Sequence, residues 1–132
     1  GVPTATPFGT LTLEPLAAVP SRMPPGPAEE VVDAEALAPP LVLRRWREGD
    51  RFHPLGLDGT KKVSDLLTER KVPPSQRDRQ LVLCAGDAVV WVIGHRLAEV
   101  GRVRPTSRRV VRLAWTPSPG GRSRRLGDDG SD

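Results

Sequence analysis

The residues of this sequence that are best suited to chemistry are cations rather than nucleophiles or metal ligands. Residues 41–113 carry 16 Lys and Arg against 8 Asp and Glu, whereas residues 1–40 carry a net charge of −4. A basic block of this kind attracts polyanions, of which RNA and DNA are the usual ones. The alternative is a solvated surface in an arginine-rich protein. Charge alone therefore leaves a nucleic-acid partner and a merely solvated surface equally open.

Side chains able to catalyse a reaction or to hold a metal ion are few and scattered. His53, His95 and Cys84 do not have metal-ligand spacing, and Cys84 falls in an apolar strand, where a thiol is unreactive. Ser64 and Asp65 have no suitably placed histidine for a catalytic triad. We therefore predict no catalytic residue and no metal site. One cysteine excludes an internal disulfide, no apolar run is long enough to cross a membrane, and we expect a cytoplasmic protein.

Two pairs of cations lie at the ends of a predicted helix. Apolar residues three and four positions apart predict this helix over residues 61–71. Lys61 and Lys62 stand at its start, where free N–H groups and the helix dipole suit a phosphate. We favour phosphate contact over the alternative of a solvated lysine pair. Arg70 and Lys71 stand at its end, where they either contact RNA or serve the last carbonyl groups.

A second short helix carries two further cations. Pro74 can open this helix, which is predicted to extend through Arg79. Arg77 and Arg79 are two residues apart and therefore point in different directions. We expect one of them to reach RNA and the other to pair with Asp78 or a carbonyl group. The candidate RNA-binding residues are thus Lys61, Lys62, Arg70, Lys71, Arg77 and Arg79.

A turn and a loop that precede the first helix are predicted to be architectural. Gly49 permits a positive φ, and Asp50 can accept N–H bonds of the turn. We expect Arg51 to brace Asp50, with RNA contact as the alternative. Gly56 and Gly59 bracket a loop in which the main chain could approach a ligand closely. The structural residues singled out are Trp46, Gly49, Asp50, Phe52, Gly56 and Gly59.

The few large aromatic side chains indicate which kind of RNA the basic block would suit. Trp46, Phe52, Trp91 and Trp115 all lie in strand-like or apolar settings and are predicted to be core. Proteins recognise an A-form stem largely through phosphates and 2′-hydroxyls, whereas single-strand binders use exposed stacking rings. The composition therefore favours a stem.

Strand-like segments predict an α+β fold with a mainly antiparallel sheet system and helices on one side. Alternating or β-branched residues predict strands over residues 8–14, 30–33, 41–46, 81–85, 88–93, 100–104 and 109–115. Gly86 and Asp87 form a two-residue hairpin turn. Residues 33–37 are predicted to form a turn or one helical turn.

The chain is predicted to divide into three regions. Residues 1–29 would be an upstream strand and a proline-rich linker, with residues 15–27 as loop. Residues 30–115 would form the organised domain. Residues 116–132, rich in Gly, Pro, Ser, Arg and Asp, would be a disordered tail.

A distinctive series of short motifs runs through the central block. It reads LRRWREGDRFHPLG at residues 43–56, GTKKVSDLL at 59–67, RKVP at 70–73 and RDR at 77–79. In this order the motifs closely resemble the C-terminal domain of the tRNA(Ile)-lysidine synthetase family. The resemblance covers roughly residues 30–114, and its specificity lies in the ordered combination.

The resemblance implies a layered β/β/α fold, related to a domain of the phenylalanyl-tRNA synthetase β chain. It also implies recognition of the tRNA body, notably the acceptor stem. The parent enzyme would use ATP to attach lysine to the wobble cytidine of the minor isoleucine tRNA. The family's S-G-G-x-D-S phosphate-binding loop belongs to an N-terminal domain and is absent from this sequence. We therefore expect ATP and Mg²⁺ to act in that domain and this fragment to have no active site of its own.

The resemblance also implies the partners of the domain. They are the minor isoleucine tRNA and the enzyme's own N-terminal catalytic domain, with no membrane and with a homodimer left open. The alternative function is a protein-interaction module, for dimerisation or interdomain docking, whose basic face does not contact RNA.

Overall fold

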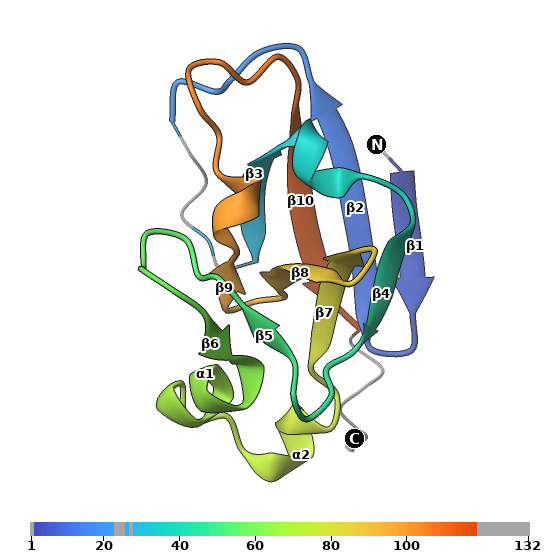
Figure 1. Ribbon diagram of the computed structural model, residues 1–132. Coiled ribbons are helices and arrows are strands. Elements are labelled where there is room, and N and C mark those ends of the chain that lie inside the picture. The colour runs from blue at the N-terminus through green and yellow to red at the C-terminus, as the bar shows by residue number, and fades with distance from the viewer. Residues whose placement is uncertain (1, 23–25, 27, 119–132) are drawn as a thin grey trace.

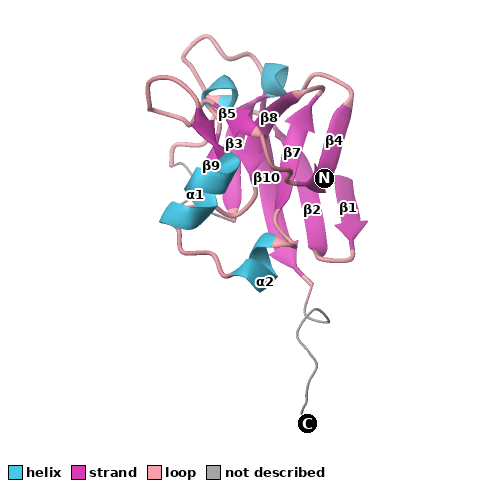
Figure 2. Cartoon of the chain, turned by 60° about the horizontal axis from the view of Figure 1, so that its bottom comes forward, coloured by secondary structure: helices cyan, strands magenta, loops and turns pink. Residues whose placement is uncertain are grey.

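The chain folds into two stacked antiparallel sheets, with one short helix on the outer face of the second sheet and another at the end of the sheets (Figures 1 and 2). In this computed structural model the described residues are 2–22, 26 and 28–118. The predicted α+β class and the β/β/α layering are confirmed. The termini of the described chain both lie in the first sheet, so residues from both ends of the sequence build one layer.

The first sheet has the strand order β1-β2-β10-β3. Its members are β1 (Val2–Thr6), β2 (Gly9–Leu16), β3 (Glu29–Asp33) and β10 (Val110–Pro117). Strand β1 was not predicted, because Pro3 within it and Pro7 after it interrupt any alternation. A proline is tolerated in β1 because this strand is an edge and one side of its backbone needs no partner.

The second sheet lies in the middle of the molecule and has the order β4-β7-β8-β9. Its members are β4 (Leu41–Arg45), β7 (Leu81–Ala85), β8 (Ala88–Val92) and β9 (Arg96–Leu97). The predicted hairpin is confirmed, and Gly86 adopts the positive φ of +60° that its turn requires. A register shift between Leu83 and Cys84 interrupts the ladder with β8. This irregularity changes which residues of β8 face each side of the sheet.

One apolar cluster fills the space between the two sheets. Leu11 and Leu113 of the first sheet meet Leu83 and Trp91 of the second, and all four are at most 2% exposed. Burial of such side chains contributes about 1.5–3 kcal/mol each. This cluster fixes the first sheet on the second.

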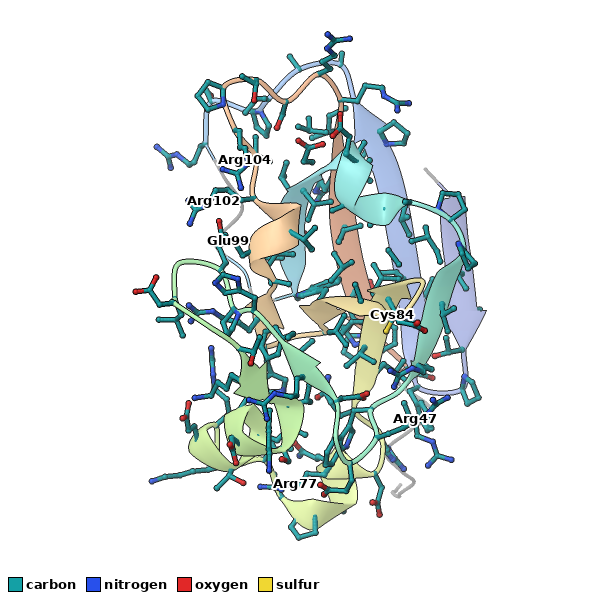
Figure 3. The ribbon with its side chains drawn as sticks, in the orientation of Figure 1. Arg47, Arg77, Cys84, Glu99, Arg102 and Arg104 are labelled. Carbon is teal, nitrogen blue, oxygen red and sulfur yellow. The ribbon has the colours of Figure 1, made fainter. Side chains whose placement is uncertain are left out.

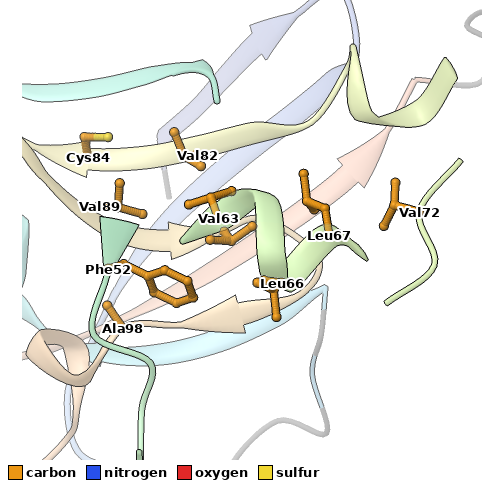
Figure 4. Close-up of a cluster of buried hydrophobic side chains, with 10 residues drawn as sticks. Phe52, Val63, Leu66, Leu67, Val72, Val82, Cys84, Val89 and Ala98 are labelled. Carbon is orange, nitrogen blue, oxygen red and sulfur yellow. The ribbon is translucent and has the colours of Figure 1, made fainter. Parts of the chain in front are cut away.

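A second cluster lies on the other face of the middle sheet, beneath helix α1 (Val63–Glu69) (Figure 4). Val63, Leu66 and Leu67 of this helix pack toward Val82 of β7, and Phe52 completes the cluster. Their spacing is the one that predicted the helix. The remaining elements at this end are α2 (Pro74–Arg77), β5 (Arg51–Phe52) and β6 (Lys61–Lys62).

Two short 3₁₀ helices complete the fold. The first, η1 (Ala34–Leu37), confirms the helical turn expected after β3, and Asp33 caps it by accepting the Glu35 N–H at 2.9 Å. The second, η2 (Glu99–Gly101), lies where a strand over residues 100–104 was predicted, so that prediction is wrong. The Arg102 N–H bonds to the Glu99 carbonyl at 3.0 Å, and this bond curls the chain away from extended geometry.

Element boundaries also differ from prediction elsewhere, and α2 ends at Arg77 instead of residue 79. Helix α1 ends at Glu69 instead of residue 71, because the chain turns at Lys71, where φ is +56°. Strand β2 continues through Pro15, beyond the stretch that pairs with β1. At the other end β10 continues through Pro117, opposite Gly9. In the predicted proline-rich loop, residues 17–22 form neither helix nor strand, as expected, and residues 23–25 and 27 lie outside the described residues. Residues 119–132 of the predicted tail also lie outside them.

Leu67→Ala should destabilise the fold by about 2–5 kcal/mol, because Leu67 is fully buried between α1 and the middle sheet. Urea denaturation followed by circular dichroism measures the free energy of unfolding. Leu57→Ala is the matched control, since Leu57 is 48% exposed and its truncation should change stability by less than about 0.5 kcal/mol. Equal losses in both variants would contradict the assigned core.

Candidate nucleic-acid interface

The six cations predicted to bind RNA all lie at the end of the molecule that carries α1, α2 and β6. This end is at the bottom of Figure 1. In Figure 3 the label of Arg77 lies beside α2, whereas Arg102 and Arg104 lie toward the opposite end, near η2. The structure therefore brings the predicted cations together on one end but does not gather every arginine of the chain there.

The turn before β5 is held by a charged pair that the sequence analysis did not identify. Arg44 donates two hydrogen bonds to the Asp50 carboxylate, at 2.9 and 3.0 Å, and the Arg47 N–H donates a third at 2.7 Å. Gly49 has the positive φ expected of it, +93°. The expectation that Arg51 braces Asp50 is wrong, because the Arg51 guanidinium donates to the Thr60 hydroxyl across the β5–β6 ladder.

The pairing with Arg44 also affects the pKa of the Asp50 carboxyl. Burial alone would raise the pKa of the Asp50 carboxyl. The hydrogen bonds from Arg44 and Arg47, together with the charges of these arginines, outweigh burial and hold the pKa of Asp50 below its ordinary value. The main-chain carbonyl of Asp50 accepts the Val63 N–H at 2.9 Å, so the turn also fixes the start of α1.

We expected Lys61 and Lys62 to lie on the first turn of a helix, but they do not. They form strand β6, paired with Arg51 and Phe52, and the first N–H of α1 is already bonded to the Asp50 carbonyl. Pairing with β5 overrides the helical tendency of the two lysines. Helix α1 has only seven residues. The helix-dipole argument for a phosphate at this point therefore loses its basis.

The two lysines also differ from each other. Lys61 is only 25% exposed and forms an ion pair with Glu69 at the end of α1. Lys62 is exposed, and among the described residues it has no ion pair. Only Lys62 of this pair thus presents a charge that no neighbouring carboxylate offsets.

Arg77 is held in place by two hydrogen bonds from its side chain. Its guanidinium donates to the Val72 carbonyl at 3.1 Å and to the Thr68 hydroxyl at 2.8 Å. Its own carbonyl accepts the indole N–H of Trp46 at 2.8 Å, which ties β4 to α2. The oxygens of two neutral groups therefore fix the direction of the Arg77 side chain. No carboxylate among the described residues forms an ion pair with it. Arg45 is held similarly, by the Asp78 carbonyl at 3.0 Å.

The remaining predicted cations line the ends of both helices. Arg70 donates to the His95 carbonyl at 3.1 Å, so its partner is not one of the last carbonyl groups of its own helix. Lys71 and Arg79 are both exposed. Lys71 lies in the turn after α1, and its N–H bonds to the Thr68 carbonyl at 3.0 Å. These residues add positive charge to the end that carries α1 and α2.

Three arginines outside this end of the described chain are paired with carboxylates. Arg102 and Arg104 contact Glu99 at 2.6 and 3.8 Å, and Arg112 bridges Glu14 and Glu29. The hydrogen bond from Arg102, then that from the Gly56 N–H, lowers the pKa of Glu99 to about 2. A count of cations from sequence does not distinguish these neutralised arginines from those near α2.

The predicted glycines and thiol are explained by local structure. Gly56 and Gly59 have φ values of +82° and +75°, but an added Cβ would meet open space at both. They are needed for conformation, and contact with a ligand there stays a prediction. Cys84 is buried, and this burial raises the pKa of its thiol. Within residues 2–22, 26 and 28–118, no cluster of His, Cys, Asp or Glu could hold a metal ion, and no helix could span a membrane.

Fold and surface together define a small layered β/β/α module with a basic end. The family model described as "TilS substrate C-terminal domain" matches residues 41–115. The chain belongs to this family.

Comparisons with individual proteins agree with that assignment. The tRNA(Ile)-lysidine synthase of Symbiobacterium thermophilum is 41% identical over 111 residues, which are 83% of this chain and 22% of that protein. The synthase of Bacteroides thetaiotaomicron is 41% identical over 90 residues, 68% of this chain and 21% of that protein. The chain thus spans about a fifth of the length of these relatives.

Two solved structures are similar. A crystal structure of a TilS C-terminal domain superimposes with a TM-score of 0.77 at 27% identity, covering 88% of this chain and 90% of that one. A fragment of the phenylalanyl-tRNA synthetase β-subunit of Pyrococcus horikoshii gives a TM-score of 0.54 at 16% identity, over 66% of this chain and 27% of that one. The second likeness shows a shared fold, as the sequence analysis expected.

Asp50→Asn should lower the stability of the domain at pH 7 by about 1–3 kcal/mol, because it removes the charge that Arg44 and Arg47 bind. A carboxyl whose pKa is lowered by folding stabilises the fold above its unfolded pKa of about 4, and this contribution is lost as the pH falls through the folded pKa.

The variant should therefore lose less stability than the wild type between about pH 5 and pH 2, as measured by urea denaturation at each pH. Asp58→Asn, at an exposed position in the next loop, is the control and should follow the wild-type curve. Parallel curves for wild type and Asp50→Asn would show that the pair does not stabilise the fold.

Proposed function

We propose that this chain is the tRNA-recognising part of a tRNA(Ile)-lysidine synthetase and binds the acceptor stem through the end that carries α1 and α2. Family membership supports the choice of tRNA. The observation that carries the choice of surface is the set of arginines held by neutral oxygens, chiefly Arg77.

The proposal rests on how a protein can bind a folded RNA stem. An A-form stem hides its base edges, so phosphates and 2′-hydroxyls are the groups within reach. Arg77 and Arg70 offer guanidinium groups whose direction is fixed by carbonyl oxygens, and Lys62 and Lys71 add exposed charge. No carboxylate among the described residues forms an ion pair with any of these four. Such groups suit phosphates better than neutralised arginines do.

The chemistry of the parent enzyme would lie outside this chain. The relatives are named tRNA(Ile)-lysidine synthase, and the chain covers only about a fifth of them. We propose that ATP and Mg²⁺ act in a catalytic domain N-terminal to this one in a cytoplasmic enzyme. That domain would be the partner of the present one, which would hold the tRNA while lysine is attached to the wobble cytidine.

Interdomain docking is a second candidate function, favoured by an apolar pocket at the β1 and β4 edges of the two sheets. Thr4 and Leu13 of the first sheet and Leu41 and Leu43 of the second line this pocket of about 510 Å³. Leu41 is 41% exposed. Binding at such a surface would depend little on salt, whereas binding of RNA by a basic end weakens steeply as salt is added.

Replacement of Lys62 and Lys71 by alanine should weaken tRNA binding and flatten its dependence on salt. Removing one phosphate-binding cation should reduce the slope of log affinity against log salt by up to roughly 0.9. Both side chains are exposed, so the fold should be nearly unaffected. Affinity for a transcript of the minor isoleucine tRNA at four or five salt concentrations measures both effects.

The matched control is Arg108→Ala with Arg109→Ala, which removes the same charge from an exposed loop between η2 and β10 at the opposite end (Figure 1). This variant should keep most of the wild-type slope. If the two double variants bind tRNA alike, the end with α1 and α2 is not the RNA site, and interdomain docking becomes the better interpretation.

The purified chain should form no lysidine when incubated with ATP, Mg²⁺, lysine and the tRNA transcript. The physical reason is that the sequence contains no S-G-G-x-D-S phosphate-binding loop. Mass spectrometry of nucleosides from the digested transcript detects the product. Lysidine above the level of a reaction without protein would contradict the assignment of catalysis to another domain.

A further inference from the structure

A polar pocket lies between the β9 edge of the middle sheet, the end of α1 and the start of β3. Its volume is about 390 Å³, within the range of about 300–1,000 Å³ that small-molecule sites occupy. The side chains that line it include Glu30, Leu55, Arg70, His95, Arg96 and Leu97. A carboxylate, an imidazole and two guanidinium groups therefore border one concave space.

Both arginines of this pocket are held in place without losing their charge. Arg70 donates to the His95 carbonyl at 3.1 Å, and Arg96 donates to the Leu55 carbonyl at 2.6 Å. Among the described residues neither guanidinium has a carboxylate within ion-pair distance. A guanidinium has five N–H donors, so each retains several for an anion.

Glu30 is the unusual member of the pocket. It is only partly exposed, and no described residue donates a hydrogen bond to its carboxylate. Burial raises its pKa, an effect that the attraction of Arg96 partly opposes. Its neighbour Glu29, in contrast, has Arg112 as a close partner. A half-buried carboxylate without a donor costs free energy that a bound hydroxyl or amino group would recover.

His95 lines the pocket with an uncharged imidazole ring. Burial, and then the proximity of Arg70, lowers the pKa of this imidazole. The ring is therefore neutral at pH 7. The pocket thus has a cationic side made by the two arginines and an acceptor supplied by Glu30.

We propose that this pocket receives one ribonucleotide of the bound RNA, its phosphate against Arg70 and Arg96 and its 2′-hydroxyl donating to Glu30. This inference rests on the proposed function and adds to it a site that recognises the 2′-hydroxyl of a ribose. Phosphate alone would need no carboxylate, and a carboxylate repels phosphate unless a donor lies between them. A ribose provides that donor, and the 2′-hydroxyl is the group by which a protein distinguishes RNA from DNA.

The experiment measures the affinity of the chain for tRNA transcripts in which single nucleotides are replaced one at a time by their 2′-deoxy forms. At one position the replacement should weaken binding by the wild type about fivefold, the effect of removing one hydrogen bond. Glu30→Ala should bind unmodified tRNA about fivefold more weakly and show no further loss at that position. Glu30→Gln, which retains an acceptor oxygen, should keep part of the sensitivity.

Glu35→Ala is the matched control, because Glu35 is an exposed carboxylate on η1 outside this pocket. It should respond to every deoxy replacement as the wild type does. Thermal unfolding of each variant verifies that the fold is retained. The ribose site is overturned if Glu30→Ala remains as sensitive as the wild type to deoxy replacement at every position. If the double variant Lys62→Ala with Lys71→Ala still weakens tRNA binding in that case, the proposed function stands. If the wild-type chain binds no tRNA, both are overturned.

Discussion

The middle sheet must be apolar on both of its faces, and every other layer of the molecule depends on that condition. Strand β7 presents Leu81 and Leu83 to the first sheet and Val82 and Cys84 to α1. A helix of seven residues cannot be stable by itself, so α1 exists because this outer face covers it. The basic end rests on α1 and α2 and is therefore positioned by the hairpin of β7 and β8.

The parts of the fold that could be predicted are those whose signal is local. Gly86 marks the turn of the hairpin, and residues alternate along β4 and β10 with the period of a strand. What could not be predicted depends on pairing between distant segments. Strand β6 consists of two lysines, which favour no strand, and it forms because β5 lies beside them. Strand β9 has only two residues, too few for any periodicity to appear.

The same distinction applies to the basic surface. That the six cations share one end of the molecule could be predicted, because they lie close together along the chain. Which cations are neutralised could not, because the partners are six or eight residues away, as with Asp50 for Arg44 and Glu69 for Lys61. Nor could the carbonyl oxygen that holds Arg77 be found, since every residue has a carbonyl group and only the fold decides which one is near.

The anchored arginines have a kinetic consequence. A free arginine or lysine side chain gives up to about 2 kcal/mol of rotamer entropy when it is immobilised. Arg77 has given up part of that freedom during folding, through bonds to Val72 and Thr68, whereas the exposed Lys62 and Lys71 have kept theirs. Mobile charges mainly accelerate the approach of a polyanion, and rigid donors mainly slow its departure. The lysines of this end would therefore govern the association rate with a polyanion, and its arginines the lifetime of the complex.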